Sequence, residues 1–146
     1  MKNFLIRLAL LGACTILTIA DSLAEQCTTN SATGCNSITV VAESLELSSC
    51  AATKNAGVIR VRVTNTLNDH SLPITSITLS GPTASAPIPE FDVNAKETKE
   101  FTFKGLVNGS YTVITTRNDN GCIYTCSNIL VHTRKLNCLP LMCCST

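Results

Sequence analysis

Gly57-Val58-Ile59-Arg60-Val61-Arg62-Val63-Thr64 (GVIRVRVT, residues 57–64) is the stretch that decides the fold class. Its apolar residues Ile59, Val61 and Val63 alternate with Arg60 and Arg62. Successive side chains of a β-strand point to opposite faces, so this period of two predicts a half-buried strand with a wet outer face. Such a strand is typical of an antiparallel sheet that is packed on one side only.

Other short β-rich stretches lie on both sides of this strand, and turn residues separate them. The strongest turn signals are residues 65–69, the Gly81-Pro82 pair and residues 118–121. Residues 82–89 are rich in Pro, Ala and Ser and predict a loop or an edge segment. The predicted strands cover residues 38–41, 44–47, 57–64, 74–79, 98–104, 110–116 and 123–131. Strands at this spacing, without a helical period, predict an all-β, Ig-like Greek-key β-sandwich.

The most specific local motif is Leu106-Val107-Asn108-Gly109-Ser110-Tyr111. An L-x-x-G-x-Y run that enters a strand is typical of the tyrosine corner of Greek-key sandwiches, in which the Tyr hydroxyl bonds back to the backbone. Leu106, Gly109 and Tyr111 are therefore predicted to be structural. Asn108 also begins an N-x-S sequon, which a eukaryotic host would glycosylate, although its place in a tight turn favours turn chemistry.

The first 24 residues predict a cleaved secretory signal peptide. Lys2 and Arg7 precede an apolar run over residues 8–20, and Ser22-Leu23-Ala24 places small residues at the −3 and −1 positions. We expect cleavage after Ala24 and a mature N-terminus at Glu25. The apolar run is shorter than the about 20 residues that a transmembrane helix needs, so no membrane insertion is expected after cleavage.

An alternative for the N-terminus is a lipoprotein signal. Leu11-Gly12-Ala13-Cys14 resembles a lipobox, in which Cys14 would be acylated. Cleavage there would leave only a very short apolar stretch before the cut and the apolar residues 15–20 directly after it. Ordinary cleavage after Ala24 explains the run better.

Length and charge describe one small neutral domain. The chain has 146 residues with 11 basic and 10 acidic side chains, and signal cleavage removes Lys2, Arg7 and Asp21 and leaves equal numbers. A mature net charge of zero gives no electrostatic reason to expect nucleic acid or an anionic membrane as a partner. We expect four regions: a signal peptide (1–24), a polar lead-in with cysteines (25–36), the sandwich (37–131) and a Cys-rich tail (132–146).

Cysteines are unusually frequent and unevenly placed. Signal cleavage removes Cys14 from a total of nine and leaves an even number, which in an exported chain argues for disulfides. The mature cysteines form an early and a late group: Cys27, Cys35 and Cys50, then Cys122, Cys126, Cys138, Cys143 and Cys144. Residues 51–121 contain none, so bridges between the groups would close long loops. The spacing alone leaves the pairing open.

The sequence resembles the SprB-type repeat, an Ig-like module that occurs in tandem in large bacterial surface adhesins. The residues that carry the resemblance are Cys50, residues 57–63 (GVIRVRV), residues 103–106 (FKGL), residues 109–113 (GSYTV) and Asn120-Gly121-Cys122. It covers about residues 38–131 and implies a Cys50–Cys122 disulfide and an adhesin-like role. Leu72-Pro73-Ile74-Thr75 stands where the family has an aromatic motif, and only one copy is present.

A metal site and a catalytic site are the sharper interpretations of the polar residues. The late cysteines and His132 supply soft ligands, but zinc ribbons favour C-x₂-C knuckles in a reducing compartment. His70 and His132 are the only histidines, and neither stands in a nucleophile motif such as G-x-S-x-G. We therefore predict no catalytic residue, no metal and no cofactor.

The sequence predicts a secreted or surface-associated, non-enzymatic binding module whose partner is a protein or a glycan. Contacts would come from residues 65–71, 82–90 and 118–121, because loops at one end of such scaffolds usually carry recognition. One alternative is a disulfide-rich structural or effector protein without a ligand. A second alternative is a small metal- or thiol-active exported protein.

Overall fold

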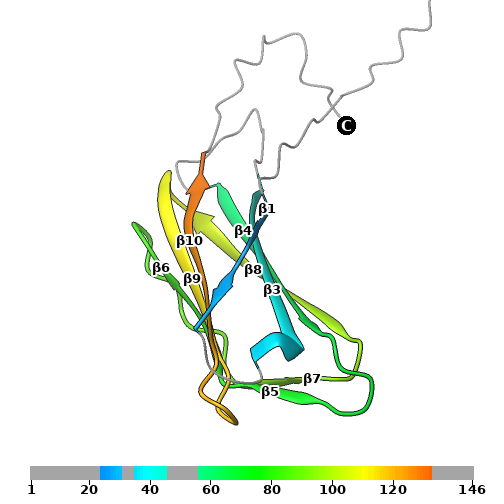
Figure 1. Cartoon of the computed structure of the whole chain (residues 1–146). Helices are drawn as coiled ribbons and strands as arrows, with labels where there is room; N and C mark the ends of the chain where they lie inside the picture. Colours follow the sequence, from blue (N-terminus) through cyan, green and yellow to red (C-terminus); the bar gives the residue numbers. More distant parts are fainter. Residues whose placement is uncertain (1–23, 31–34, 46–55, 133–146) are drawn as a thin grey trace, which may run out of the picture.

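Two antiparallel sheets face each other and enclose one hydrophobic core (Figure 1). The computed structural model describes residues 24–30, 35–45 and 56–132. In these ranges the regular structure is strand and one short 3-10 helix, so the predicted all-β class is confirmed. The predicted signal peptide up to residue 23, Cys14, Cys50 and the tail cysteines Cys138, Cys143 and Cys144 lie outside the described residues.

The first sheet is built around β4 (Gly57–Asn65), which contains the predicted strand of residues 57–64. Its strand order is β1-β3-β4-β8. The members are β1 (Ala24–Gln26), β3 (Ile38–Leu45), β4 (Gly57–Asn65) and β8 (Thr98–Leu106). Within β4, Ile59, Val61 and Val63 are fully buried whereas Arg60 and Arg62 are partly exposed. The alternation therefore places the apolar residues in the core, as predicted.

The second sheet has the order β2-β10-β9-β6. Its members are β2 (Thr28–Thr29), β10 (Ile123–Val131), β9 (Gly109–Thr116) and β6 (Ser76–Ser80). The short strands β5 (Leu72–Ile74) and β7 (Phe91–Val93) pair with each other, and η1 (Cys35–Ser37) is the 3-10 helix that leads into β3. Buried residues of β9, among them Tyr111 and Val113, belong to the same hydrophobic core as the buried residues of β4.

The segment expected to be a lead-in before the sandwich belongs to both sheets. Strand β1 pairs with β3 and β2 pairs with β10, so the chain crosses from one sheet to the other at Cys27. Backbone hydrogen bonds hold these strands, which span only three and two residues. Apolar alternation is absent from so short a segment, and its pattern therefore could not reveal the strands.

The imperfect alternation of the last predicted strand has a structural cause. The register of β10 against β9 shifts between Cys126 and Ile129, which is a β-bulge. Asn128 adopts a φ of 61° inside this bulge. Asn tolerates the left-handed region better than most residues, and the extra residue brings Ile129 and Val131 back to the core.

The two predicted stretches at 38–41 and 44–47 are joined in the structure, where β3 is continuous over Ile38–Leu45, and residues 46–47 lie outside the described residues. Pairing with β4 runs without interruption from Ile38 opposite Asn65 to Leu45 opposite Val58. Glu43 interrupts the apolar pattern in the middle of the strand, but its carboxylate is paired with Arg60. The interaction across the sheet thus compensates for a break that looks like a strand end in the sequence.

Candidate functional site

Two disulfides join the N-terminal segment to β10. Cys27 is bonded to Cys126, with a Cα–Cα distance of 4.2 Å, and Cys35 is bonded to Cys122, with a Cα–Cα distance of 5.5 Å. Their sequence separations are 99 and 87 residues. In the chain-entropy account, the first bridge to close a loop of this length is worth about 4–5 kcal/mol. The second closes only the ring formed by residues 27–35 and 122–126 and is worth about 3 kcal/mol. Such disulfides are compatible with an oxidising extracellular compartment.

The predicted Cys50–Cys122 pairing is wrong, because Cys122 is bonded to Cys35. The strand geometry explains the error. Cys122 directly precedes the first residue of β10. Gly57, the first residue of β4, lies at the other end of β10, because a Cβ built on it would lie 2.3 Å from Val131. Cys50 precedes Gly57 in the sequence. At about 3.3 Å per residue these two ends are roughly 25–30 Å apart.

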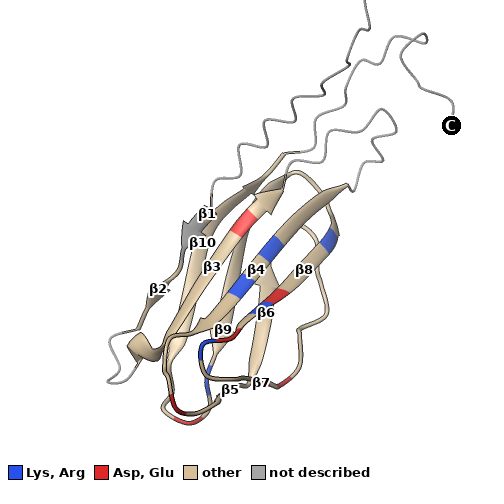
Figure 2. Ribbon diagram, turned by 90° about the vertical axis from the view of Figure 1, so that its right-hand side faces the viewer, with Lys and Arg blue, Asp and Glu red and all other residues tan. Residues whose placement is uncertain are grey.

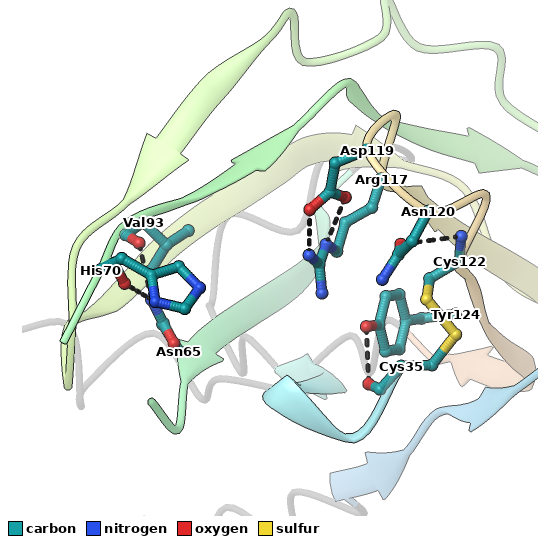
Figure 3. A network of polar contacts seen from close by, with 9 residues as sticks. All are labelled: Cys35, Asn65, His70, Val93, Arg117, Asp119, Asn120, Cys122 and Tyr124. Atoms are coloured by element: carbon teal, nitrogen blue, oxygen red, sulfur yellow. Dashed lines mark hydrogen bonds and ion pairs between the residues drawn. A yellow bond between two sulfur atoms is a disulfide. The ribbon is translucent and has the colours of Figure 1, made fainter. Parts of the chain in front are cut away.

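Two ends of the sandwich can therefore be distinguished. The disulfide end comprises η1, the Cys35–Cys122 bridge and the loops 66–71 and 117–121. The corner end comprises Gly57, Val131 and the link between β8 and β9. Figure 3 shows the polar contacts of the disulfide end.

Tyr124 and Asn30 connect the two sides of the disulfide end. The buried Tyr124 hydroxyl donates to the Cys35 carbonyl at 2.7 Å (Figure 3). Asn30 donates through its side-chain amide to the Gly121 carbonyl at 3.0 Å and accepts from the Ile123 N–H at 2.8 Å. Burial raises the pKa of Tyr124, because desolvation disfavours the phenolate, and the nearby Arg117 guanidinium opposes this shift.

Arg117 is a buried charge that fixes the turn after β9. Its side chain is 3% exposed, and its guanidinium forms a two-pronged pair with Asp119, through Nε at 2.9 Å and through Nη2 (Figure 3). Desolvation lowers the pKa of Arg117, but the hydrogen bond and charge of Asp119, with a smaller contribution from Tyr124, outweigh it, so the pKa is raised. The guanidinium therefore stays charged and ties residues 117–119 into one turn.

Three buried polar atoms near this turn have no hydrogen-bond partner among the described residues: Arg117 Nη1, Thr115 Oγ1 and Thr75 Oγ1. They are neighbours in the second sheet, since Ser76 pairs with Thr116 and the Thr75 N–H donates to the Thr116 carbonyl at 2.8 Å. Buried polar groups without partners are uncommon in folded proteins. The inner face of the sheet is therefore polar where it approaches the disulfide end.

Asn65 anchors the other loop of this end. It is completely buried, and its side-chain amide donates to the carbonyls of His70, at 2.9 Å, and Val93, at 3.0 Å. Its Oδ1 accepts the Leu67 N–H at 2.9 Å. One side chain thereby holds the start and the end of the loop 66–71 against β7 (Figure 3).

The predicted recognition segment 82–90 begins at the corner end, opposite the disulfide end. Thr83 Oγ1 accepts the Val107 N–H at 3.1 Å and lies 3.0 Å from the Tyr111 hydroxyl, so residues 82–83 lie at the corner end. The segment then runs back beside β6, where Ile88 forms a bridge with Ile77. The expectation that residues 65–71, 82–90 and 118–121 gather at one end is therefore wrong for the middle segment.

The tyrosine-corner motif makes the hydrogen bond that the sequence predicts. The Tyr111 hydroxyl donates to the Val107 carbonyl at 3.0 Å, and Leu106 is fully buried. Since a hydroxyl carries one hydrogen, Thr83 is left as the donor in its contact with Tyr111. Gly109 has a φ of 152°, and a Cβ built on it would lie 2.6 Å from Pro82. Asn108 is exposed in the link between β8 and β9.

The outer face of the first sheet carries an ion-pair network. Figure 2 shows acidic and basic positions on the neighbouring strands β3, β4 and β8. The Glu43 side chain is only 4% exposed, is paired with Arg60 and lies 3.5 Å from Arg62. Arg60 also reaches Glu100 on β8 at 3.7 Å. Both arginines of this network have an acidic partner. Their charges explain how the nearly buried Glu43 is accommodated in β3.

A hollow of about 270 Å³ lies between the N-terminal segment and β3. It is lined by Cys27, Thr29, Cys35, Asn36, Ile38, Thr39, Val40 and Tyr124. Both disulfides thus contribute a cysteine to its wall. Neither the hollow nor its lining could be anticipated from sequence, because it depends on the pairing of β2 with β10.

Other candidate chemistry is accounted for by local structure. His70 Nδ1 lies 2.8 Å from Asp69 Oδ1 in an exposed loop, and His132 is exposed directly after β10. Within the described ranges, no group of three or more His, Cys, Asp or Glu side chains is arranged to hold a metal ion. Those same ranges contain no helix that is both long and apolar enough to cross a membrane.

Sequence reasoning missed Asn65, Arg117, Tyr124 and Gly81 as structural residues. For Arg117 a signal existed: Tyr111, Val113 and Thr115 are buried at every second position, and the same parity places residue 117 inside. The remaining three depend on partners far away in the chain. No family model, no curated protein and no solved structure matches this chain.

Proposed function

We propose that this chain is an exported, non-enzymatic binding module with Ig-like Greek-key topology. The strand orders support the topology: β3-β4-β8 and β10-β9-β6 correspond to the orders A-B-E and G-F-C of Ig-type sandwiches. In this correspondence Tyr111 lies in the strand equivalent to F, where the tyrosine corner belongs. Strands β1 and β2 are additions that precede strand A.

The observation that carries the proposal is the pre-organisation of the disulfide end. Asn65 holds one loop, the Arg117–Asp119 pair holds the other turn, and the Cys35–Cys122 bridge fixes η1 next to them. Loops that are already ordered lose little conformational entropy when they bind. The exposed residues of this end are polar and rich in amides: Asn30, Asn36, Asn68, Asp69, His70, Asn118 and Asp119.

Export and adhesin-like use remain part of the same proposal. The two disulfides support an oxidising compartment, and the signal-peptide pattern supports secretion. The resemblance to the SprB-type module supports a surface role, although its Cys50–Cys122 bridge is absent. Bonded Cys27, Cys35, Cys122 and Cys126 argue against the thiol-active alternative, since a disulfide sulfur is neither thiolate nucleophile nor metal ligand.

The test uses the exported chain immobilised and probed with an envelope or host-cell extract and with an array of neutral and acidic glycans. A triple variant, Asn68→Ala, Asp69→Ala and His70→Ala, alters the loop surface and leaves the Asn65 anchor intact, because Asn65 bonds the His70 backbone. A matched control replaces the exposed Thr102 and Lys104 on β8, which lie nearer the corner end. Saturable binding that the loop variant weakens and the control retains supports the proposal. Absence of saturable binding overturns it and favours the structural or effector role.

A further inference from the structure

Strand β8 (Thr98–Leu106) forms one edge of the first sheet. It is the last strand in the order β1-β3-β4-β8, and Figure 2 shows it along one side of that sheet. Among the described residues, the backbone of β8 is hydrogen-bonded to β4 and to no other segment. Its pairing with β4 is regular from Thr98 to Lys104, and Gly105 interrupts it as a bulge. A row of backbone donors and acceptors is thus open on the other side, where a further strand can add.

The two faces of β8 carry different side chains. Glu100, Thr102 and Lys104 are exposed on the outer face of the sheet. Phe101 and Phe103 lie on the inner face, where Phe103 is buried and Phe101 is only half-buried. A strand that continued the sheet beyond β8 would therefore meet charges on the outer face and aromatic rings on the inner face.

Both charges of the outer face are available to such a strand. Lys104 has no acidic partner among the residues that the structure describes. The Glu100 side chain is 50% exposed, and its contact with Arg60 of β4 is long, at 3.7 Å. The edge thus presents one acidic and one basic side chain four residues apart, and a complementary strand would present the same two in reverse order.

A second copy of β8 has this reversed order. Two copies related by a two-fold axis run antiparallel, and their inner faces stay on one side only when the register is centred on a residue. A register centred on Thr102 places Glu100 opposite Lys104 twice and Phe101 opposite Phe103 twice. Centring on Glu100 or Lys104 opposes like charges, and centring on Phe101 or Phe103 brings no opposite charges together. Directly opposed charge pairs and aromatic pairs stabilise a sheet, so one register is favoured.

Two features that protect edge strands are compatible with this register. A lysine on the inner face and a bulge both discourage a further strand from pairing. Lys99 is half-buried on the inner face, with its Nζ 5.9 Å from the centroid of the Phe91 ring. In the register centred on Thr102 it lies opposite Gly105 of the other copy, which has no side chain. Regular pairing then covers residues 100–104 of each copy, and so short a contact makes a weak, reversible dimer.

We propose that this chain forms a homodimer through antiparallel pairing of two β8 edges centred on Thr102. The two four-stranded sheets become one continuous sheet, and the assembly stops at two copies because the contact uses the β8 edge of both. Thr98 pairs with Thr64, beside the loop anchor Asn65, so β8 begins near the disulfide end. Antiparallel pairing therefore directs the disulfide ends of the two copies in opposite directions. This assembly goes beyond the proposed function, since it suits a bridge between two separate surfaces.

The first experiment measures the dissociation constant of the dimer by sedimentation velocity of the exported chain, at concentrations up to about 1 mM. The parent should show a reversible equilibrium between monomer and dimer. Lys104→Glu opposes like charges at two positions and should raise the dissociation constant about 10-fold, and Glu100→Lys should do the same. The double variant with both changes keeps the net charge of the parent and restores the opposite pairs, so it should dimerise nearly as the parent does.

A second experiment tests the register directly. Directly opposite residues of antiparallel strands have Cα atoms about 4.5 or 5.5 Å apart, within the roughly 4.4–6.8 Å that a disulfide requires. Thr102→Cys should therefore yield a covalent dimer under mild oxidation, and peptide mapping should recover the two introduced thiols bonded to each other. Thr98→Cys is the matched control in the same strand. Its two copies would lie about 26 Å apart and should not be bonded to each other.

The outcomes separate this inference from its rivals and from the proposed function. A parent that is monomeric at every concentration overturns it, and so does a dimer that both single charge variants retain. Leu130→Ser alters the largest exposed apolar side chain on the outer face of the second sheet. A dimer that only this variant loses forms through the second sheet, which also overturns the inference. Loop binding by an immobilised chain needs no dimer, so its failure leaves the dimer standing. Unchanged thermal midpoints show that the variants are folded.

Discussion

The corner end and the disulfide end of the sandwich are held by different interactions. At the corner end the contacts are apolar packing and one small set of hydrogen bonds around Tyr111. At the disulfide end two covalent bridges and the buried polar side chains of Asn65, Arg117 and Tyr124 fix the loops. The first kind of end orders a crossover between strands, and the second kind presents ordered loops to solvent.

The two ends also differ in how closely they are packed. A Cβ on Gly81 would lie 2.3 Å from the Tyr111 ring, so the corner end has no spare space at this contact. The disulfide end contains the hollow and three buried polar atoms without a partner among the described residues. Staples make such loosely packed, polar surroundings tolerable because they limit the entropy of the unfolded chain.

The largest expected effect concerns the bridge at the disulfide end. Replacement of both Cys35 and Cys122 by Ala should lower the free energy of unfolding by about 3 kcal/mol. The Cys27–Cys126 bridge still closes the long loop, so the unfolded chain gains the freedom of the ring formed by residues 27–35 and 122–126. Chemical denaturation measures the loss. Non-reducing peptide mapping of the parent should recover Cys27–Cys126 and Cys35–Cys122, and a Cys50–Cys122 peptide would contradict the described pairing.

A glycine tests the packing of the corner end. Gly81→Ala should destabilise by about 1–3 kcal/mol, since the new methyl group would overlap the Tyr111 ring. Gly105→Ala is the control: its φ is 73° and no heavy atom lies within 4 Å of a Cβ built there, so only backbone strain of about 1 kcal/mol is expected. Equal thermal shifts for the two variants would show that Gly81 is not a packing contact.

The hydroxyl of the corner should contribute less than its packing. Tyr111→Phe should lower the free energy of unfolding by about 1–2 kcal/mol, because the Val107 carbonyl loses its donor while the ring stays in place. Equilibrium denaturation monitors the change. Thr83→Val provides a comparison within the same hydrogen-bonded set. An unchanged midpoint for Tyr111→Phe would mean that Tyr111 acts only as a packed ring.

The smallest effect is the pH-dependent contribution of Tyr124, which is absent at neutral pH and grows in alkali. Burial raises the folded-state pKa of Tyr124, so the folded protein keeps a proton that the unfolded chain loses above a pH of about 10. This contribution to stability is complete below the unfolded pKa and is lost as the pH rises through the folded pKa. Tyr124→Phe should flatten this alkaline fall in stability, as measured by denaturation at increasing pH. An equally steep fall in the variant would place its origin elsewhere.

Much of the scaffold could be predicted because its signals are local. The alternation over residues 57–64 predicted a strand, and Leu106 to Tyr111 predicted the corner hydrogen bond within six consecutive residues. Strand β10 was recognised in spite of its bulge, since Ile129 and Val131 restore the buried face. Successive side chains of a strand point to opposite faces, so the face on which a residue lies follows from its position relative to its neighbours in the sequence.

The site depends on contacts that no local pattern encodes. Cysteine counting by itself indicated disulfides and left their pairing open, and the partners of Cys122 and Cys126 became clear only when β2 was paired with β10. Asn65 and Gly81 look like ordinary turn residues in the sequence, but the first is a buried anchor and the second a close contact with Tyr111. The sequence by itself thus determined the longer strands, their inner faces and the corner, because each follows from side-chain alternation or a short motif. The tertiary structure alone decided the cysteine partners, the contact of Tyr124 with Cys35 and the hollow, because these require residues from opposite ends of the chain to meet.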